Sequence, residues 1–432
     1  MTNATQIIIL GVFIFFLVVA VIVFAMFGGS NNSASEATAV IWGPLPESVM
    51  ARATEILNNA KAGSIKIKYQ QIPAEEFEER LTNALADGTG PDAVLMTEDL
   101  LYTNRKRLTL ISYNAFSERA FKDTFVSASE VLLTDEGVYG LPFLVDPIVM
   151  YWNRDILSSA AVAEPPKTWE QSLALVPLIT EVNDDKTIKR SAIGLGDFAN
   201  VNHSKAILSA LMMQAGSRMI FWGVADAAVN QIDASQSFDT NPAEEALQFF
   251  TQFANPGKKV YSWTRALPQS MDYFAQGDLA LYFGPASDGQ KIRSKNPNLN
   301  FDVAMLPQPA TSQTKRTSSS VLSFSILTSS PNQQGALNAI ALLTGSVAGK
   351  LASDMTGLAP ARRDLLSQTG VGASQSVALE SALIASSWLD PDRGKTTTLF
   401  GRAAESIISG QAGVVDASRT LSNQIDEILQ NQ

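Results

Sequence analysis

The feature that most constrains the fold is an alternation of strand and helix patterns near the start of the chain. A short apolar run at Ala39–Gly43 ends in a turn, and apolar and polar residues alternate from Ile65 to Gln70. Apolar residues fall on one helical face in Glu47–Lys61 and again in Phe77–Leu85, and a third strand pattern follows at Asp92–Met96. This β-α-β-α-β order requires a parallel sheet with right-handed crossovers, so an α/β fold is predicted.

Open sheets of this kind bind ligands beyond the carboxyl ends of their strands. That rule directs attention to Trp42–Glu47, after the first strand, and to Thr97–Asp99, after the third. A second α/β pattern runs from about residue 150 to 306. With 432 residues the chain is longer than one hydrophobic core usually holds, so two domains are expected.

The N-terminus carries an uninterrupted apolar run. Ile7–Phe27 has no charged or strongly polar side chain and would span about 31 Å as a helix, which is one hydrocarbon thickness. A cleaved signal peptide is the alternative, but the run is long for one and no Lys or Arg precedes it. Residues 1–28 are therefore predicted to form a retained transmembrane anchor. Residues 29–38 are small and polar and are predicted to be a flexible tether.

Composition excludes several functions. A formal net charge of −10 makes nucleic acid a poor partner. The chain has no cysteine, which excludes disulfides, thiolate metal sites and a lipidated cysteine anchor. His203 is its single histidine, so a multi-histidine metal site is excluded too. No complete catalytic motif occurs, and we expect no enzyme, no metal and no cofactor.

Aromatic residues gather near predicted strand ends and turns. Flat rings stack on the apolar faces of sugars, while carboxylates and amides bind hydroxyl groups. Packing inside the core is the alternative for each ring, and Trp169, at a predicted helix start, is expected to be structural. The aromatic residues near strand ends are Trp42, Phe198, Trp222, Trp263, Tyr282, Phe283 and Trp388.

One acid interrupts an apolar stretch. Asp146 lies in the middle of Gly137–Leu157 (GVYGLPFLVDPIVMYWNRDIL), and Pro147 follows it directly. Burying an unpaired carboxylate costs several kcal/mol, and proline cannot donate to a sheet ladder. Either the segment leaves the core here, or a partner meets Asp146.

Four stretches together resemble the extracytoplasmic solute-binding proteins of ABC importers, sugar-binding family 1, which includes maltose-binding protein. The resemblance implies a two-lobed, periplasmic-binding-protein-like (type II) α/β fold with a cleft between the lobes. It is carried by Gly137–Ile156, Pro165–Glu170 (PPKTWE), Phe274–Pro285 with Asn300–Val303, and Gly357–Asp364 (GLAPARRD).

The resemblance also implies where the chain passes between lobes. Lobe 1 would comprise residues 39–145 plus 320–354, and lobe 2 residues 146–319 plus 355–432. The crossings would lie at residues 144–146, near 318–321 and near 353–357. Pro147 would end a strand of one lobe, and Asp146 would face the cleft; the alternative is that Asp146 only bonds hinge backbone.

Ligand-binding residues are carried over by position. Ala286 stands where the family often has an aromatic residue, so Trp263 or Trp388 would supply the missing stacking surface. The remaining expected ligand-binding residues are Trp42, Glu47, Glu98 and Asp99 on lobe 1, Asp146 at the crossing, and Phe198, Asn200, Asn202, His203, Tyr282 and Phe283 on lobe 2.

The resemblance finally implies a function. The protein would capture an extracytoplasmic solute, with a sugar or oligosaccharide favoured, and deliver it to a membrane permease with ATPase subunits. Its body would lie outside the cytoplasm, anchored by Ile7–Phe27. A polyamine, nucleoside or peptide as solute, or a tethered sensor or adhesion module, stays open. Several cleft acids around an aromatic box would favour a polyamine, and amides with flat rings a sugar.

Overall fold

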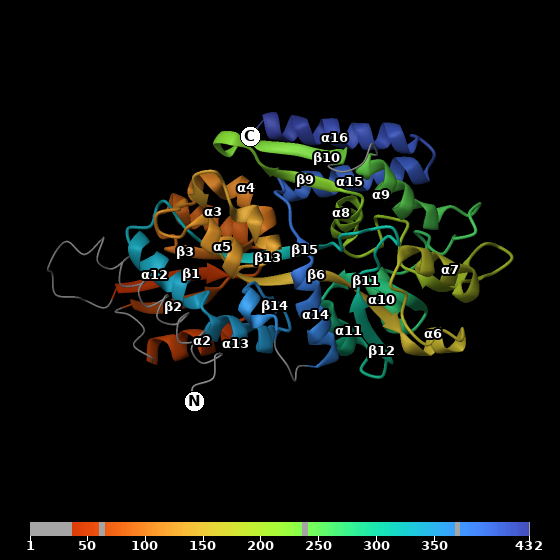
Figure 1. The fold of residues 1–432 in the computed structure, drawn as a ribbon, viewed down its shortest axis with the longest axis horizontal. Helices are drawn as coiled ribbons and strands as arrows, with labels where there is room; N and C mark the ends of the chain where they lie inside the picture. The colour runs from red at the N-terminus through yellow and green to blue at the C-terminus, as the bar shows by residue number, and fades with distance from the viewer. Residues whose placement is uncertain (1–36, 60–64, 236–240, 368–371, 432) are drawn as a thin grey trace.

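The computed structural model describes residues 37–59, 65–235, 241–367 and 372–431 (Figure 1). The predicted anchor and nearly all of the predicted tether lie outside these residues. Within the described part, no single helix is both long and apolar enough to cross a membrane. The consecutive helices Gln333–Leu343 and Ser346–Thr356 are long and apolar enough when taken together, but they meet at an angle of 63°.

The predicted β-α-β-α-β unit is confirmed. Its elements are β1 (Ala37–Gly43), α2 (Glu47–Asn59), β2 (Ile65–Gln71), α3 (Phe77–Ala86) and β3 (Ala93–Thr97). β1 lies between β2 and β3 and pairs in parallel with both. Their carboxyl ends therefore meet at one edge of the sheet, as expected.

The main sheet has the strand order β2-β1-β3-β13-β6-β11-β8-β7, with β12, β14 and β15 paired beside this path. Figure 1 shows helices and strands gathered into two halves. We call β1, β2 and β3 with their helices the first half, and β7, β8, β11 and β12 with theirs the second half. The new strands are β6 (Leu141–Asn153), β7 (Glu181–Val182), β8 (Ile188–Ile193), β11 (Leu279–Pro285), β12 (Phe301–Met305), β13 (Thr317–Ile326), β14 (Ala359–Pro360) and β15 (Ala385–Ser386).

β6 runs without a break through both halves. It pairs with β13 from Leu141 to Pro147, with β11 from Ile148 onward and with β12 from Val149 onward. The expectation that Pro147 ends a strand is therefore wrong. Pro147 lies where β6 exchanges one neighbour for the other, so its missing N–H interrupts no ladder, and its carbonyl accepts from the Ala286 N–H at 3.0 Å.

The third passage between the halves comes later than expected. β14 pairs with Val145 and Leu144 of β6, and Arg362 bridges to Phe125. These contacts keep the chain with the first half beyond residue 357. Only then does α14 (Ala373–Leu383) pack against β6 and β12.

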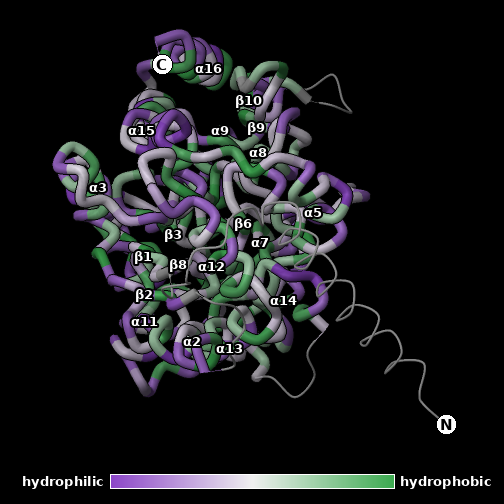
Figure 2. The backbone as a smooth tube through the Cα atoms, turned by 90° about the vertical axis from the view of Figure 1, so that its left-hand side faces the viewer, coloured by the Kyte–Doolittle hydropathy of each residue, from purple (hydrophilic) through white to green (hydrophobic). Residues whose placement is uncertain are grey.

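The rest of the second half was not resolved from sequence patterns. β9 (Ser217–Trp222) and β10 (Ala228–Ser235) form an antiparallel hairpin, and α15 (Arg393–Ile408) and α16 (Val414–Gln430) pack near it. In Figure 2 hydrophobic and hydrophilic positions alternate along α16, because its buried residues share one face.

The other helices are α4 (Leu101–Asn104), α5 (Glu118–Thr124), α6 (Arg154–Ser159), α7 (Trp169–Ile179), α8 (Ser204–Gln214), α9 (Pro242–Thr251), α10 (Ser270–Gln276), α11 (Asp288–Lys295), α12 (Gln333–Leu343) and α13 (Ser346–Thr356). A short antiparallel pair is formed by β4 (Ile111–Ser112) and β5 (Gly137–Val138).

Trp169 is structural, as predicted. Thr168 and Gln171 form a capping box at the start of α7, which fixes the helix N-terminus. The buried Trp169 indole donates from Nε1 to Oε1 of Gln214 at 2.7 Å and packs against Phe249 and Phe283.

Gly140 precedes β6 and touches β13. A Cβ at this position would lie 2.6 Å from the Phe324 carbonyl oxygen and 2.6 Å from Ser325 Oγ. Because backbone atoms cannot yield cheaply, we expect Gly140→Ala to lower the free energy of unfolding by about 1–3 kcal/mol in urea titrations. Gly413→Ala is the control, since a Cβ added there would meet no atom within 4 Å. Equal stability of the two variants would contradict this account of β6 packing.

Candidate functional site

Two acids at the end of β3 face the second half. The Glu98 side chain accepts from the Val321 N–H on β13 at 2.7 Å through Oε2. Asp99 accepts from the Thr97 hydroxyl at 2.5 Å and lies 3.6 Å from Nη1 of Arg393, at the start of α15. This ion pair joins the halves, so both acids stand where the sequence predicted a binding surface.

Burial is the main influence on the pKa of Glu98, which it raises to about 8. The neighbouring charge of Asp99 raises this pKa further, and hydrogen bonds from Val321 and Ser387 lower it. Glu98 is therefore largely protonated at neutral pH. A neutral carboxyl can donate to a hydroxyl oxygen as well as accept from one.

A buried ion pair fixes the segment that carries Trp388. The Lys205 ammonium, on α8, contacts the carboxylate of Asp390 and donates to Thr396 Oγ1 at 2.8 Å. Burial raises the pKa of Asp390, and Lys205 counteracts this. The Lys205 nitrogen also lies 5.3 Å from the Trp388 ring, which stacks on Phe400. Trp388 is thus held rigidly and is mostly buried.

Asp146 meets a partner from the second half. Its Oδ1 accepts from the Ser287 N–H at 3.0 Å, just after β11. Burial raises the pKa of Asp146 to about 6; Ser287 opposes the rise, and the nearby Asp288 adds to it. The structure thus shows a backbone contact at this crossing, and contact with a solute stays a prediction.

Asp288 organises a second polar group beside Asp146. Its buried carboxylate accepts from the Tyr282 hydroxyl at 2.6 Å, lies 2.8 Å from His203 Nε2 and pairs with Lys291 at 2.8 Å. Together these partners hold the pKa of Asp288 below its usual value despite burial. His203 adopts a left-handed backbone conformation, with φ 58°, at the start of α8.

Several expected ligand-binding residues instead hold the second half together. Trp263 is fully buried and donates from Nε1 to Oδ1 of the buried Asn200 at 2.8 Å. Tyr282 and Phe283 are buried inside the same half. All four side chains are covered in this structure, so their contact with a solute stays a prediction.

The other expected residues keep some exposure. Asn202 is half-buried, and its Oδ1 accepts from the Met271 N–H at 2.9 Å. Trp42 and Phe198 are half-buried, and Glu47 is exposed at the start of α2. Their roles in binding stay predictions. Within the described residues, no group of three or more His, Asp and Glu side chains is arranged to hold a metal.

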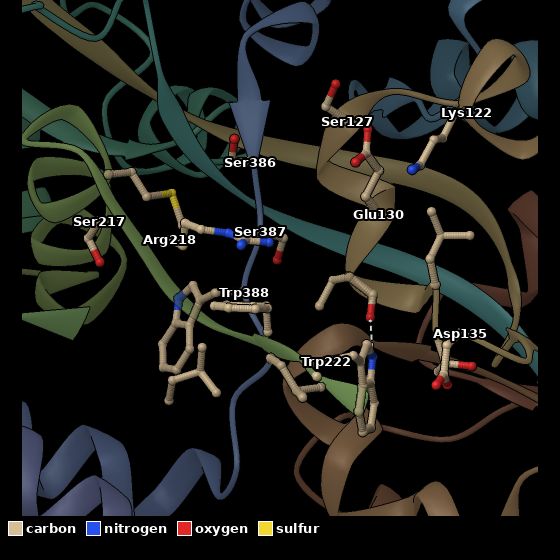
Figure 3. A pocket seen from close by; sticks show the side chains of 18 of the residues that line it. Lys122, Ser127, Glu130, Asp135, Ser217, Arg218, Trp222, Ser386, Ser387 and Trp388 are labelled. Carbon is tan, nitrogen blue, oxygen red and sulfur yellow. Dashed lines mark hydrogen bonds between the residues drawn. The ribbon is translucent and has the colours of Figure 1, made fainter. Parts of the chain in front are cut away.

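A pocket of about 600 Å³ lies between the halves (Figure 3). One wall comes from α5, the 3₁₀ segment Ser127–Leu132 and Asp135; the other comes from β9, Arg316 and Ser386–Leu389. Trp388 alone among the expected residues lines it. Trp222 closes one end, where its Nε1 donates to the Val131 carbonyl oxygen at 2.8 Å, as Figure 3 shows.

Sequence patterns missed most of this pocket. Trp222 stood out as an aromatic residue near a strand end, and the structure packs it against Tyr102 and Tyr139 of the first half, with ring centroids 5.6 and 5.4 Å away. Arg218 and Glu130 carried no motif. Only the folded chain brings β9 beside the Ser127–Leu132 segment, so no local signal could have found them.

Asp146→Asn should separate the charge of Asp146 from its hydrogen bond, because the amide oxygen can still accept from Ser287. Folding raises the pKa of Asp146 from 3.8 to about 6, so the folded state favours the protonated carboxyl. The stability that this protonation contributes is full below pH 4 and is lost as pH rises through 6. We expect the variant to match the parent at pH 4 and to exceed it by about 2 kcal/mol at pH 8 in urea titrations.

The exposed Asp416→Asn is the control for removing a carboxylate elsewhere, and its stability difference from the parent should change less between the two pH values than that of Asp146→Asn. If Asp146→Asn showed no pH-dependent difference, the assigned burial of Asp146 would be wrong.

Comparisons with known proteins identify the family. Residues 42–350 match the family described as bacterial extracellular solute-binding protein. Binding proteins from Brucella abortus (strain 2308) and Brucella suis biovar 1 (strain 1330) are each 23% identical over 255 residues, 57% of either chain. The chain thus spans little more than half the length of these curated relatives.

Solved structures share the fold. A cyclic alpha-maltosyl-1,6-maltose binding protein from Arthrobacter globiformis superposes with a TM-score of 0.75 at 15% identity, over 92% of this chain and all of that one. A cyclo/maltodextrin-binding protein complexed with maltotetraose gives 0.73 at 15% identity, over 93% and 98%. The sugar-binding protein MalE from Xanthomonas citri gives 0.70 at 18% identity, over 91% and 98%.

These matches confirm the predicted periplasmic-binding-protein fold. Proteins of this family bind solutes and are not enzymes, which confirms the prediction of a non-catalytic role. The chain belongs to the bacterial extracellular solute-binding protein family.

Proposed function

We propose that this protein is the substrate-binding component of an ABC import system. It captures an extracytoplasmic solute between its two halves and delivers it to a membrane permease with ATPase subunits. Family membership supports this role. The observation that carries it is the pocket of about 600 Å³, because a site of that size suits a small molecule and takes its walls from both halves.

The two halves act as lobes in this proposal. Lobe 1 consists of residues 39–145 plus 320–354, extended by the β14 segment, and lobe 2 of residues 146–319 plus the C-terminal part of the chain. β6 and β13 join them as a hinge. A solute that touches both walls binds the closed arrangement better, which shifts the population toward closure. Residues 1–28 anchor the body to the outer face of the membrane.

A sugar or oligosaccharide is the proposed solute. Three structural neighbours are named for maltose-type or other sugar ligands. In this chain the pocket combines indole rings of Trp222 and Trp388 with serine hydroxyls, a composition suited to pyranose rings and their hydroxyl groups. Since Trp388 is mostly covered, Trp222 offers the larger surface.

A polyamine is the second candidate solute. Asp99 and Asp146 bring two carboxylates to the meeting of the halves, whereas the amide of Asn200, expected to bind hydroxyls, is used inside the second half. No comparable contact among the described residues supports a nucleoside or a peptide as the solute. None supports a non-transport role as a sensor or adhesion module.

The first test follows the melting temperature of the purified full-length chain against oligosaccharides, polyamines, nucleosides and short peptides. A solute at a hundred times its Kd adds about 2.7 kcal/mol of stability, which gives a clear shift. We expect the shift with a saccharide. A shift with polyamines alone would replace the solute and keep the role.

Native mass spectrometry of the same sample supplies the control, because a co-purified ligand would occupy the pocket and suppress any shift. No shift from a preparation shown to be ligand-free would contradict the proposed function.

A further inference from the structure

The pocket between the halves has walls of opposite charge. Arg218 and Arg316 line the side formed by the second half, and Glu130 and Asp135 line the side formed by the first. Lys122 also lines it, but its ammonium pairs with Glu118 at 2.6 Å. The unpaired positive charge therefore belongs to one wall.

Arg218 extends from β9 into the pocket. Its guanidinium lies 3.7 Å from the centre of the Phe221 ring, and Figure 3 shows the side chain reaching toward Ser387. Among the described residues no carboxylate lies within ion-pair distance of Arg218. Stacking on a ring holds the plane of a guanidinium while leaving its edge N–H groups free to donate.

Arg316 is held in place through its backbone. Its N–H donates to Oε1 of Gln308 at 2.8 Å, and its carbonyl accepts from Nε2 of Gln214 at 3.0 Å. Arg316 as a whole residue is half-buried, and within the described part of the chain its guanidinium has no ion-pair partner. The fold thus fixes a second arginine at the pocket while leaving its charge without an acid.

These arginines contrast with others in the chain that do have acidic partners. Arg265 binds both Asp197 and Glu405, and Arg393 faces Asp99. In a chain with a net charge of −10, acids are plentiful, yet among the described residues none is placed against Arg218 or Arg316. A planar guanidinium is the side chain best suited to bind a carboxylate or phosphate through two parallel hydrogen bonds.

We propose that the solute is an acidic saccharide whose anionic group lies at Arg218 and Arg316. Its hydroxylated part lies toward Trp222, Trp388 and the serines, and Glu130 and Asp135 repel the anionic group from the opposite wall. This inference rests on the proposed function and narrows its solute class. A carboxylate, as in a uronic acid, and a phosphate share the required chemistry, so the experiment includes both.

The test is isothermal titration calorimetry of the full-length chain with three probe sets: neutral maltodextrins, oligogalacturonates of matching length, and glucose phosphates. Variants are Arg218→Gln and Arg316→Gln, with Arg419→Gln on the exposed face of α16 as control. Loss of one charge-assisted hydrogen-bond pair should weaken binding by about 10- to 100-fold.

We expect the parent to bind an acidic probe, each pocket variant to lose about 10- to 100-fold in affinity for it, and the control to bind like the parent. Added salt should weaken the parent's binding more than that of the variants. Preference for oligogalacturonate identifies a carboxylate, and preference for a glucose phosphate identifies a phosphate.

Two outcomes would overturn the inference in distinguishable ways. If maltodextrins bind and the arginine variants leave that binding unchanged, the acidic class is wrong and the importer role stands. If no saccharide of any set binds ligand-free protein, the proposed sugar solute fails together with the inference. Melting curves of all variants show whether each remains folded.

Discussion

The fold depends on β6, a single strand that pairs with strands of both halves. One strand, Leu141–Asn153, supplies hydrogen bonds first to β13 and then to β11 and β12, and the exchange of neighbours falls at Pro147. A proline is tolerated there because no neighbour requires its missing donor. The same exchange places Asp146 beside Ser287, so a polar contact between the halves lies at the point where β6 changes neighbours.

Charge burial around this junction is costly. Glu98, Asp146 and Asp390 all have raised pKa values, chiefly because burial disfavours the carboxylate. Lys205 offsets only part of this, through its contact with Asp390. Burial at this junction therefore favours the neutral form of these three acids.

Sequence periodicity and capping residues predicted the positions of individual strands and helices, because these depend on residues close together in the chain. The alternation of apolar residues located β1, α2, β2, α3 and β3, and Thr168 marked the start of α7. Motif order, rather than periodicity, pointed to the two-lobed fold. Neither could show that Trp263 and Asn200 satisfy each other inside the second half, or that β9 brings Arg218 beside a wall from the first half, because both depend on contacts far apart in sequence.

The central claim is that a solute closes the two halves about β6 and β13. Because the chain has no cysteine, Arg119→Cys on α5 and Leu178→Cys on α7 can carry spin labels without background, and both side chains are exposed. Pulsed electron paramagnetic resonance would then measure the distance between the two labels, one in each half, with and without the solute found by thermal shift. We expect a shorter and narrower distance distribution with solute. An unchanged distribution at saturation would contradict closure about β6 and β13.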